Sequence, residues 1–259
     1  MGFAERLKKS IKAHKSGIRK NPVDDIAYKL KGYKLAQKQN IKTPIIYRVY
    51  KNINDVDWEE LPNKFVIKPQ AGCSTNGVYP LVYKGKEVYF DLLRKTTLPL
   101  KKYMKLYSEG ERHSKSLWIE ELLSEPLPYD WKLYAFNGNI GLIRQFNRNE
   151  KPATAKCYDT DWNEVKVFGT NYKKNHYLPK PMFPNELIST AEKLSKAVRY
   201  PFVRVDLYET VNGVYFGEIT PHPAHAFQLS KEYDDYLDNL WIEAEGELNE
   251  QKNNCSNTF

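Results

Sequence analysis

Two carboxylates in the last predicted hairpin form the clearest chemical feature of this 259-residue sequence. Residues 202–209 and 214–220 are predicted strands joined by a short turn. A three-residue turn places Asp206 directly opposite Glu218, whereas a two-residue turn would put them on opposite faces. Opposed carboxylates repel each other unless a cation lies between them, and Mg²⁺ is bound by carboxylate and phosphate oxygens. The hairpin therefore predicts a magnesium site, with a solvated surface hairpin as the alternative.

The same register divides the hairpin into a chemical face and a core face. The expected chemical face carries Arg204, Asp206, Tyr208, Phe216, Glu218 and Thr220. The expected core face carries Val203, Val205, Leu207, Tyr215, Gly217 and Ile219.

A lysine that ends a short predicted strand precedes a loop of small residues. The strand, residues 64–68, ends with Lys68, and the loop spans residues 70–77. Small side chains let backbone N–H groups approach phosphate oxygens, and the lysine would add a positive charge. The loop lacks the Gly-Lys-Ser/Thr of a Walker A motif, so an ordinary turn remains the alternative. The candidate phosphate-binding residues are Lys68, Gly72, Ser74, Thr75, Asn76 and Gly77.

Two other segments carry polar groups at strand positions. The backbone of Glu120, Glu121 and Leu123 follows an apolar strand and could bind the edge of an adenine, although a helix start explains the pattern equally well. In the hairpin around Asn137-Gly138, one strand presents Asp130 and Lys132 on the same side, and a three-residue turn would bring Arg144 to them; a paired charge cluster is the alternative.

The elements that must position these residues are a mixture of helices and hairpins. Helices are expected at 24–40, 185–198 and 233–248, and residues 89–111 are expected to be helical and then irregular. Several strand pairs are antiparallel hairpins, which favours an α+β fold over a doubly wound parallel sheet.

In order and spacing, these elements resemble the ATP-grasp fold, and most closely its TupA-like branch, named after a protein of teichuronopeptide synthesis. The matching segments are 65–69 with its glycine loop, 118–123, 129–134, 203–208 and 215–220. The resemblance implies that ATP lies between two antiparallel sheets. It divides the chain into a basic helix with a small reduced N-terminal lobe (1–62), a middle lobe with the phosphate loop (63–122), a C-terminal lobe (123–248) and a flexible tail (249–259).

The resemblance also assigns roles to single residues. It implies that Lys68 and Lys29 contact phosphates, and Lys31 is the alternative to Lys29. It also implies that Glu120–Leu123 form the adenine hinge and that Asp130 binds the ribose hydroxyls. Asp206 and Glu218 would bind Mg²⁺. Arg204 would stabilise the transferring phosphoryl group, and Lys132 and Arg144 complete the candidate catalytic set.

The sequence departs from the wider family after the second metal carboxylate. Many ATP-grasp proteins have Asn two residues later, whereas this chain has Thr220, as the TupA-like branch does. The following Pro-rich stretch contains His222 and His225, which are candidate substrate contacts or parts of a rigid exit from the strand.

The chemistry implied by the resemblance is ATP-dependent joining of a carboxylate to an amine through an acyl-phosphate. A uronic acid or an amino acid would supply the carboxylate, in the synthesis of a cell-surface polysaccharide or peptide polymer. A kinase of the same fold, which would phosphorylate a hydroxyl, is one alternative. The second alternative is a non-catalytic binder of an anionic polymer.

The second alternative arises from the charge distribution. Residues 1–42 contain 12 Lys and Arg against 3 Asp and Glu, so the basic excess of the chain lies at this end. An apolar stripe of Phe3, Leu7 and Ile11 among lysines predicts a helix that is either a solvated face or a peripheral contact for a membrane or an acidic polymer. Basic and aromatic residues do not alternate along one strand, so no nucleic-acid partner is expected.

The remaining bulk properties favour a cytoplasmic protein. The three cysteines are widely separated, no segment has the length of a membrane span, and residues 1–20 lack the apolar core of a secretory signal.

Overall fold

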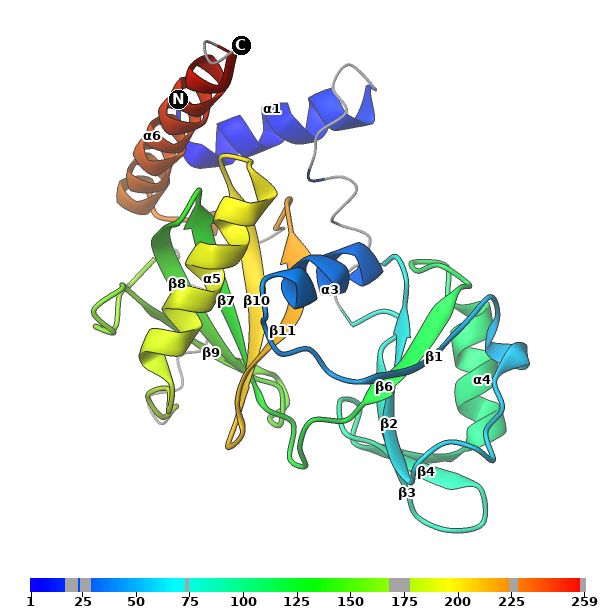
Figure 1. Cartoon of the computed structure of the whole chain (residues 1–259). Coiled ribbons are helices and arrows are strands. Elements are labelled where there is room, and N and C mark those ends of the chain that lie inside the picture. The colour runs from blue at the N-terminus through cyan, green and yellow to red at the C-terminus, as the bar shows by residue number, and fades with distance from the viewer. Residues whose placement is uncertain (17–22, 24–28, 73–74, 168–177, 224–227, 257–259) are drawn as a thin grey trace.

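Two antiparallel sheets form the framework of the protein, as the computed structural model shows (Figure 1). The structure describes residues 1–16, 23, 29–72, 75–167, 178–223 and 228–256. The first sheet has the strand order β1-β6-β2-β3-β4-β5, with β1 (Ile46–Tyr50), β2 (Lys64–Pro69), β3 (Tyr79–Tyr83), β4 (Val88–Asp91), β5 (Thr96–Pro99) and β6 (Leu117–Glu121). The second has the order β11-β10-β7-β8-β9, with β7 (Tyr129–Phe136), β8 (Asn139–Asn147), β9 (Thr154–Tyr158), β10 (Val203–Thr210) and β11 (Gly213–Thr220). The expected α+β class and the expected pair of antiparallel sheets are confirmed.

Helices cover the sheets on several sides. The described helices are α1 (Phe3–Lys15), α3 (Lys29–Lys38), α4 (Leu100–Glu109), α5 (Pro184–Val198) and α6 (Lys231–Ser256), with a short 3₁₀ turn, η1 (Ile53–Asp55). In Figure 1, α4 lies on the first sheet, α5 on the second, and α3 between the two. Within the described parts of the chain, no helix combines the length and the apolar character needed to cross a bilayer.

The β10–β11 hairpin pairs Asp206 with Glu218 as predicted, but its turn differs from the predicted one. Thr210 pairs with Gly213, so the turn has two residues instead of three. A β-bulge at Gly217 then restores the register, and Asp206 lies opposite Glu218. The prediction of the three-residue turn is wrong, and so is the placement of Phe216, which pairs with Leu207 and is fully buried in the core.

The β7–β8 hairpin also has a two-residue turn. Asn137 and Gly138 both have positive φ, at 47° and 106°, which is typical of a type I′ turn. A register shift between Tyr134 and Ala135 still leaves Lys132 opposite Arg144. The two side chains therefore share a face of the sheet, although the expected three-residue turn is absent.

Two predicted boundaries differ from the structure. Residues 89–111 contain strands β4 and β5 before α4, so the expected early helix is wrong. Helix α6 continues past Leu248 to Ser256, so the expected flexible tail is helical over most of its length. Residues 24–28 of the expected helix 24–40 lie outside the described residues.

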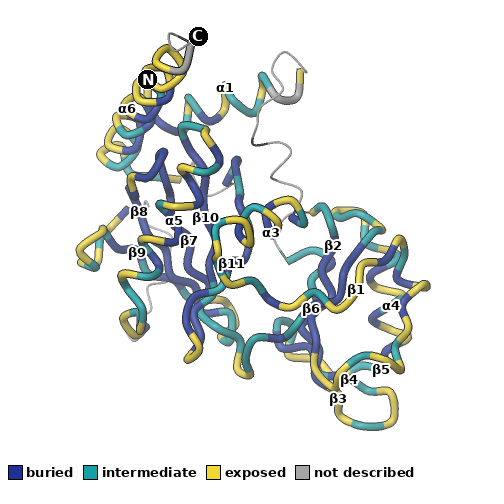
Figure 2. The backbone as a smooth tube through the Cα atoms, in the orientation of Figure 1, coloured by how far each residue is buried: buried dark blue, intermediate teal, exposed yellow. Residues whose placement is uncertain are grey.

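The N-terminal basic helix has a structural partner. Phe3 and Leu7 are fully buried, and Ile11 packs beside them in a cluster that includes Trp241 of α6 and Phe202 and Phe136 of the second sheet. Figure 2 shows this buried interior as dark tube beneath α1 and α6. The apolar stripe is thus covered by the protein itself, while Lys8, Lys9 and Lys12 remain exposed.

A second core lies between the sheets and α5. Its buried members include Leu187, Ala191 and Leu194 on one face of α5, with spacings of three and four residues, as an amphipathic helix requires. Tyr33 of α3, Trp118 of the first sheet and Phe216 of the second sheet belong to the same core. Strand β1, within the segment expected as a small N-terminal lobe, pairs with β6 of the first sheet. The sheets are therefore joined by packed side chains as well as by the connecting chain.

Candidate functional site

A cleft of about 860 Å³, counted with the open space at its mouth, lies between the two sheets. Its apolar lining comes from Val66, Val78, Pro80, Leu93, Leu122, Leu123, Leu127 and Pro128. Its charged lining comes from Lys29, Lys68, Lys132 and Arg148 and from Glu120, Glu121, Asp130, Asp206 and Glu218. Apolar walls beside a band of mixed charge suit a ligand with an aromatic end and a charged end.

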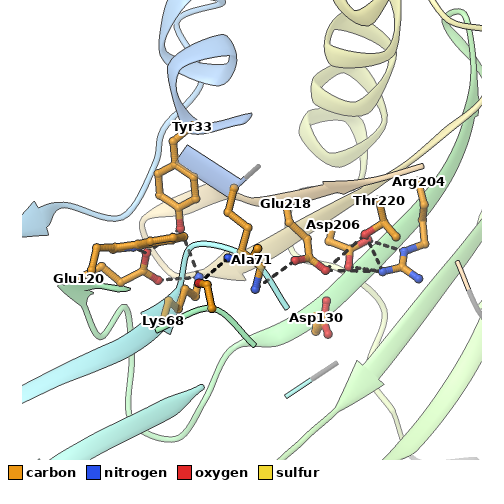
Figure 3. A network of polar contacts seen from close by, with 12 residues as sticks. Tyr33, Lys68, Ala71, Glu120, Asp130, Arg204, Asp206, Glu218 and Thr220 are labelled. Carbon is orange, nitrogen blue, oxygen red and sulfur yellow. Dashed lines mark hydrogen bonds and ion pairs between the residues drawn. The ribbon is translucent and has the colours of Figure 1, made fainter. Parts of the chain in front are cut away.

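Asp206 lies at the centre of the charged band. Arg204 donates from Nε and Nη2 to the two carboxylate oxygens of Asp206, at 2.6 and 2.7 Å (Figure 3). Lys132 donates to the same carboxylate. Burial raises the pKa of Asp206 against the opposing effect of these two cations. Asp206 raises the pKa of Arg204 and outweighs the effect of burial, so the guanidinium stays charged.

Glu218 lies opposite Asp206 on the neighbouring strand and faces the cleft. Lys29 of α3 lies 3.6 Å from its carboxylate, Arg204 lies 3.8 Å away, and Thr220 donates to it at 3.3 Å. Burial alone would raise the pKa of Glu218, but Lys29, Lys132 and Arg204 lower it below its usual value. Lys29 is buried in the cleft wall and Lys31 is exposed, which favours Lys29 of the two candidate lysines.

The donor set at Asp206 and Glu218 fits a hard divalent cation. Both side chains offer carboxylate oxygens, and Mg²⁺ is usually held by one or two carboxylates, with phosphates and water completing its shell. No group of three or more His, Cys, Asp or Glu side chains suited to a metal occurs among the described residues. A metal at this pair would therefore depend on a phosphate ligand for further oxygens.

Lys68 is held by a buried polar network on the other side of the cleft. Its ammonium group lies 2.6 Å from Glu120 Oε1 and 3.2 Å from the hydroxyl of Tyr33 (Figure 3). The hydroxyl of Tyr33 and the indole N–H of Trp118 each donate to Glu120 Oε2 at 2.7 Å. Burial lowers the pKa of Lys68, but Glu120, Tyr208 and Tyr33 together raise it well above the usual value.

The predicted hinge lies where the first sheet ends. Pairing of β6 with β2 extends to Glu121, which lies opposite Phe65, so Leu122 and Leu123 lie beyond the ladder and line the cleft. The side chain of Glu120, in contrast, is committed to Lys68 and its neighbours.

Arg148 is a cleft residue that the sequence analysis did not identify. Its guanidinium donates from Nε and Nη2 to one oxygen of Asp130 at 2.9 and 2.7 Å, and Lys132 donates to the other at 3.0 Å. Burial would raise the pKa of Asp130, but Lys132 and Arg148 lower it well below the usual range. Asp130 lines the cleft, and both of its oxygens are paired. Arg148 follows strand β8 and carries no sequence motif, so only the fold reveals it.

The glycines of the small-residue loop have a packing role. A Cβ on Gly72 would lie 2.9 Å from His113 Cβ, and one on Gly77, whose φ is +72°, would lie 2.7 Å from the His113 ring. Thr75 lines the cleft, and Asn76 is not among the lining residues. Ser74 lies outside the described residues. Close contact with His113 therefore explains both glycines without a ligand.

Three of the remaining candidates, Arg144, Thr220 and His222, are not among the residues that line the cleft. Arg144 is buried, and its guanidinium lies 4.7 Å from the ring centre of Phe146. Thr220 accepts a hydrogen bond from Arg204 at 3.0 Å. His222 follows strand β11, and His225 lies outside the described residues. The structure thus brings Arg204, Lys132, Asp206 and Glu218 together and sets Arg144 beside them on the sheet.

Comparisons with known proteins identify the family and agree with the fold. The family model described as TupA-like ATPgrasp matches residues 8–242. None of the curated proteins matches the chain.

Several solved structures share the fold. A D-alanine–D-alanine ligase from Bacillus anthracis, complexed with ATP, is 16% identical with a TM-score of 0.54, over 89% of this chain and 70% of that one. VanG D-Ala:D-Ser ligase from Enterococcus faecalis is 16% identical with a TM-score of 0.51, over 83% of this chain and 61% of that one. The ATP-grasp ligase PsnB, in a complex containing Mg and ADP, is 12% identical with a TM-score of 0.50, over 86% of this chain and 60% of that one. At these identities the likeness concerns the fold.

Proposed function

The chain belongs to the TupA-like ATP-grasp family, and from that premise we propose that it binds Mg-ATP in the cleft and uses it to join a carboxylate to an amine. An ATP-dependent ligase is the enzyme class that the family and the fold support.

One observation carries the proposal: the two sheets present complementary groups to the same cleft. The second sheet presents Asp206 beside Glu218, and the first presents Lys68. A nucleotide whose phosphates reached Lys68 could share a metal with the two carboxylates, while Leu122 and Leu123 covered its base. The ATP complex and the Mg and ADP complex among the similar structures support this placement.

The charge of the cleft argues for a metal together with the nucleotide. Four basic and five acidic side chains line the described cleft, so it offers no net positive charge to an isolated polyphosphate. A divalent ion at Asp206 and Glu218 would reverse the local balance and would polarise the transferred phosphoryl group.

The residues of this chain would then act on the transferred group. We assign Arg204 and Lys132 to the charge that develops as a carboxylate oxygen bonds to the γ-phosphorus and the bond to ADP breaks, because preorganised cations stabilise such charge. The acyl-phosphate formed would be attacked by an amine. A C–N bond forms, phosphate leaves with the C–O electron pair, and the amine releases a proton.

We also propose the class of substrate and of product. Kinship with a family named after teichuronopeptide synthesis supports a uronic acid or an amino acid as the carboxylate, and a cell-surface polymer as the product. We place the reaction in the cytoplasm, where ATP is available.

Hydroxylamine trapping tests the reaction type. The protein is incubated with Mg-ATP, hydroxylamine and single carboxylates from a panel of uronic and amino acids, and hydroxamate formation is measured. A hydroxamate that needs both ATP and the carboxylate supports the ligase. ATP consumption that phosphorylates a hydroxyl of the same compounds, without hydroxamate, would show a kinase instead.

A further inference from the structure

We infer that Tyr33 is a positioning residue for Lys68: through Glu120 it fixes the lysine ammonium group where a phosphate of the nucleotide must arrive. The inference rests on the proposed function and deepens it, because it adds a residue of helix α3 to the nucleotide site.

A lysine in this place needs external positioning. Its side chain has four flexible carbons and ends in a compact ammonium group with three N–H donors. Glu120 and Tyr33 account for two donors, at 2.6 and 3.2 Å. Among the described residues no hydrogen bond takes up the third, and the ring centre of Tyr208 lies 5.4 Å from the ammonium nitrogen. Lys68 lines the cleft, so the third donor is available to a ligand there.

Glu120 can orient the lysine only if its own carboxylate is held still. The hydroxyl of Tyr33 and the indole N–H of Trp118 both donate to Oε2 at 2.7 Å, which leaves Oε1 for Lys68. Burial and the adjacent Glu120 raise the pKa of Tyr33 well above its usual value. The hydroxyl therefore keeps its proton and remains a donor to the carboxylate.

The ring of Tyr33 is itself fixed by packing between the two sheets. It meets Trp118 of the first sheet edge-on, with ring centres 5.7 Å apart, and Phe216 of the second sheet at 5.4 Å. Lys29, one helical turn earlier on α3, lies 3.6 Å from Glu218. Helix α3 thus contacts the lysine network of the first sheet through Tyr33, as Figure 3 shows, and Glu218 of the second sheet through Lys29.

The test uses Tyr33→Phe, which keeps the ring and removes only the hydroxyl. Tyr103→Phe is the matched control, because that buried tyrosine donates to backbone oxygens of Tyr89 and Thr96, away from the cleft. A second variant, Glu120→Gln, removes the charge that holds Lys68 and keeps the side-chain shape. Affinities for Mg-ATP and for adenosine are measured by calorimetry. Acetylation of Lys68 by acetic anhydride, without nucleotide, is followed by mass spectrometry.

If Tyr33 positions Lys68, loss of its hydroxyl should weaken binding of the phosphates and not binding of the nucleoside. Tyr33→Phe should weaken Mg-ATP binding by about two- to ten-fold, the usual effect of one hydrogen bond, while leaving adenosine binding unchanged. Lys68 should be acetylated faster in Tyr33→Phe and in Glu120→Gln, and at the wild-type rate in Tyr103→Phe.

Three results would overturn the inference. Unchanged acetylation and unchanged Mg-ATP affinity in Tyr33→Phe would show that the hydroxyl does not position Lys68. Equal weakening of Mg-ATP and adenosine would show that it serves structure alone. Failure of the wild type to bind Mg-ATP would remove the proposed function as well, which distinguishes that failure from the other two.

Discussion

The ion pair between Lys68 and Glu120 links stability to function at the level of single residues. Both side chains are almost wholly buried, with 7% and 2% of their surface exposed. Removing one partner of a buried pair leaves an uncompensated charge, which costs more than removing both. The pair therefore allows the effect of a lost charge to be separated from the effect of a lost contact.

Lys68→Met should lower the free energy of unfolding by about 3–5 kcal/mol, because it strands the Glu120 carboxylate in the interior. Lys68→Met/Glu120→Gln should recover most of the loss and still bind Mg-ATP poorly. Urea denaturation measures the first effect and calorimetry the second. Lys105→Met, which breaks the exposed pair with Glu109, should leave both unchanged; equal losses in the single and double variants would contradict the buried-charge explanation.

Asp130 offers a pH test of the cluster that Lys132 and Arg148 form around it. These cations depress its folded-state pKa below the unfolded value of about 3.9. The stabilisation is therefore fully present above that value and is lost as the pH falls toward the depressed folded-state value. The stability advantage of the wild type over Asp130→Asn should be constant near neutral pH and should shrink under acid conditions.

Urea midpoints of wild type and Asp130→Asn, compared from pH 7 down to the lowest pH at which both fold, check this dependence. An advantage that stayed constant throughout would show that the carboxylate charge is not what the two cations stabilise.

Most of the charged residues that line the cleft were candidates from the sequence alone, because their chemistry is local. Arg204, Asp206 and Glu218 lie on strands that the sequence pattern predicts, and Lys68 follows a short apolar run, Phe65–Ile67. Arg148 was missed because its role arises from a contact with Asp130 across the sheet, and no spacing in the chain records that contact.

At the scale of elements, the β10–β11 hairpin shows how a correct pairing can follow from a wrong turn. A two-residue turn without a bulge would have separated Asp206 from Glu218, and the bulge at Gly217 corrects the register. A bulge shifts the pairing of two strands by one residue, and its only sign in the sequence here is a glycine. The periodicity of apolar residues does not reveal it. The strands at 88–91 and 96–99 were missed for a related reason, since they are only four residues long.

Gly217→Ala tests whether the bulge positions the carboxylates. An added Cβ would lie 2.9 Å from the backbone oxygen of Asp206 and 3.0 Å from the Tyr208 ring. The strain should cost about 1–3 kcal/mol of stability and should weaken Mg-dependent ATP binding by displacing Asp206 from Glu218.

Gly246→Ala is the matched control, because a Cβ there meets nothing within 4 Å on helix α6. It should stabilise the protein by up to about 1 kcal/mol and leave binding unchanged. Normal Mg-ATP affinity in folded Gly217→Ala would show that the site does not depend on the bulge.

At the scale of the whole molecule, helix α1 acts as a cover of the second sheet. Phe3 lies with ring centres 4.8 Å from Phe202 and 5.9 Å from Trp241. Arg6 adds an ion pair to Asp238 of α6 at 2.6 Å. The sequence predicted this helix and its apolar stripe, but not its partner, because the residues that cover the stripe lie more than 100 positions away.

Phe3→Ala should lower the free energy of unfolding by about 3–5 kcal/mol, as truncation of a buried aromatic residue does. Lys8→Gln/Lys12→Gln, which changes only the exposed face of the same helix, should stay within about 0.5 kcal/mol of the wild type. Urea denaturation of the two variants measures the contrast. Similar small losses in both would mean that α1 does not stabilise the fold.

The central claim is that the two sheets hold Mg-ATP through Asp206 and Glu218, and calorimetric titration with ATP tests it most directly. The wild type, Asp206→Asn/Glu218→Gln and the surface control Asp235→Asn/Glu243→Gln are compared with and without Mg²⁺. We predict binding in the micromolar to millimolar range that requires Mg²⁺, persists in the control and collapses in the cleft variant. Absence of binding by the wild type, or binding that survives loss of both cleft carboxylates, would contradict the claim.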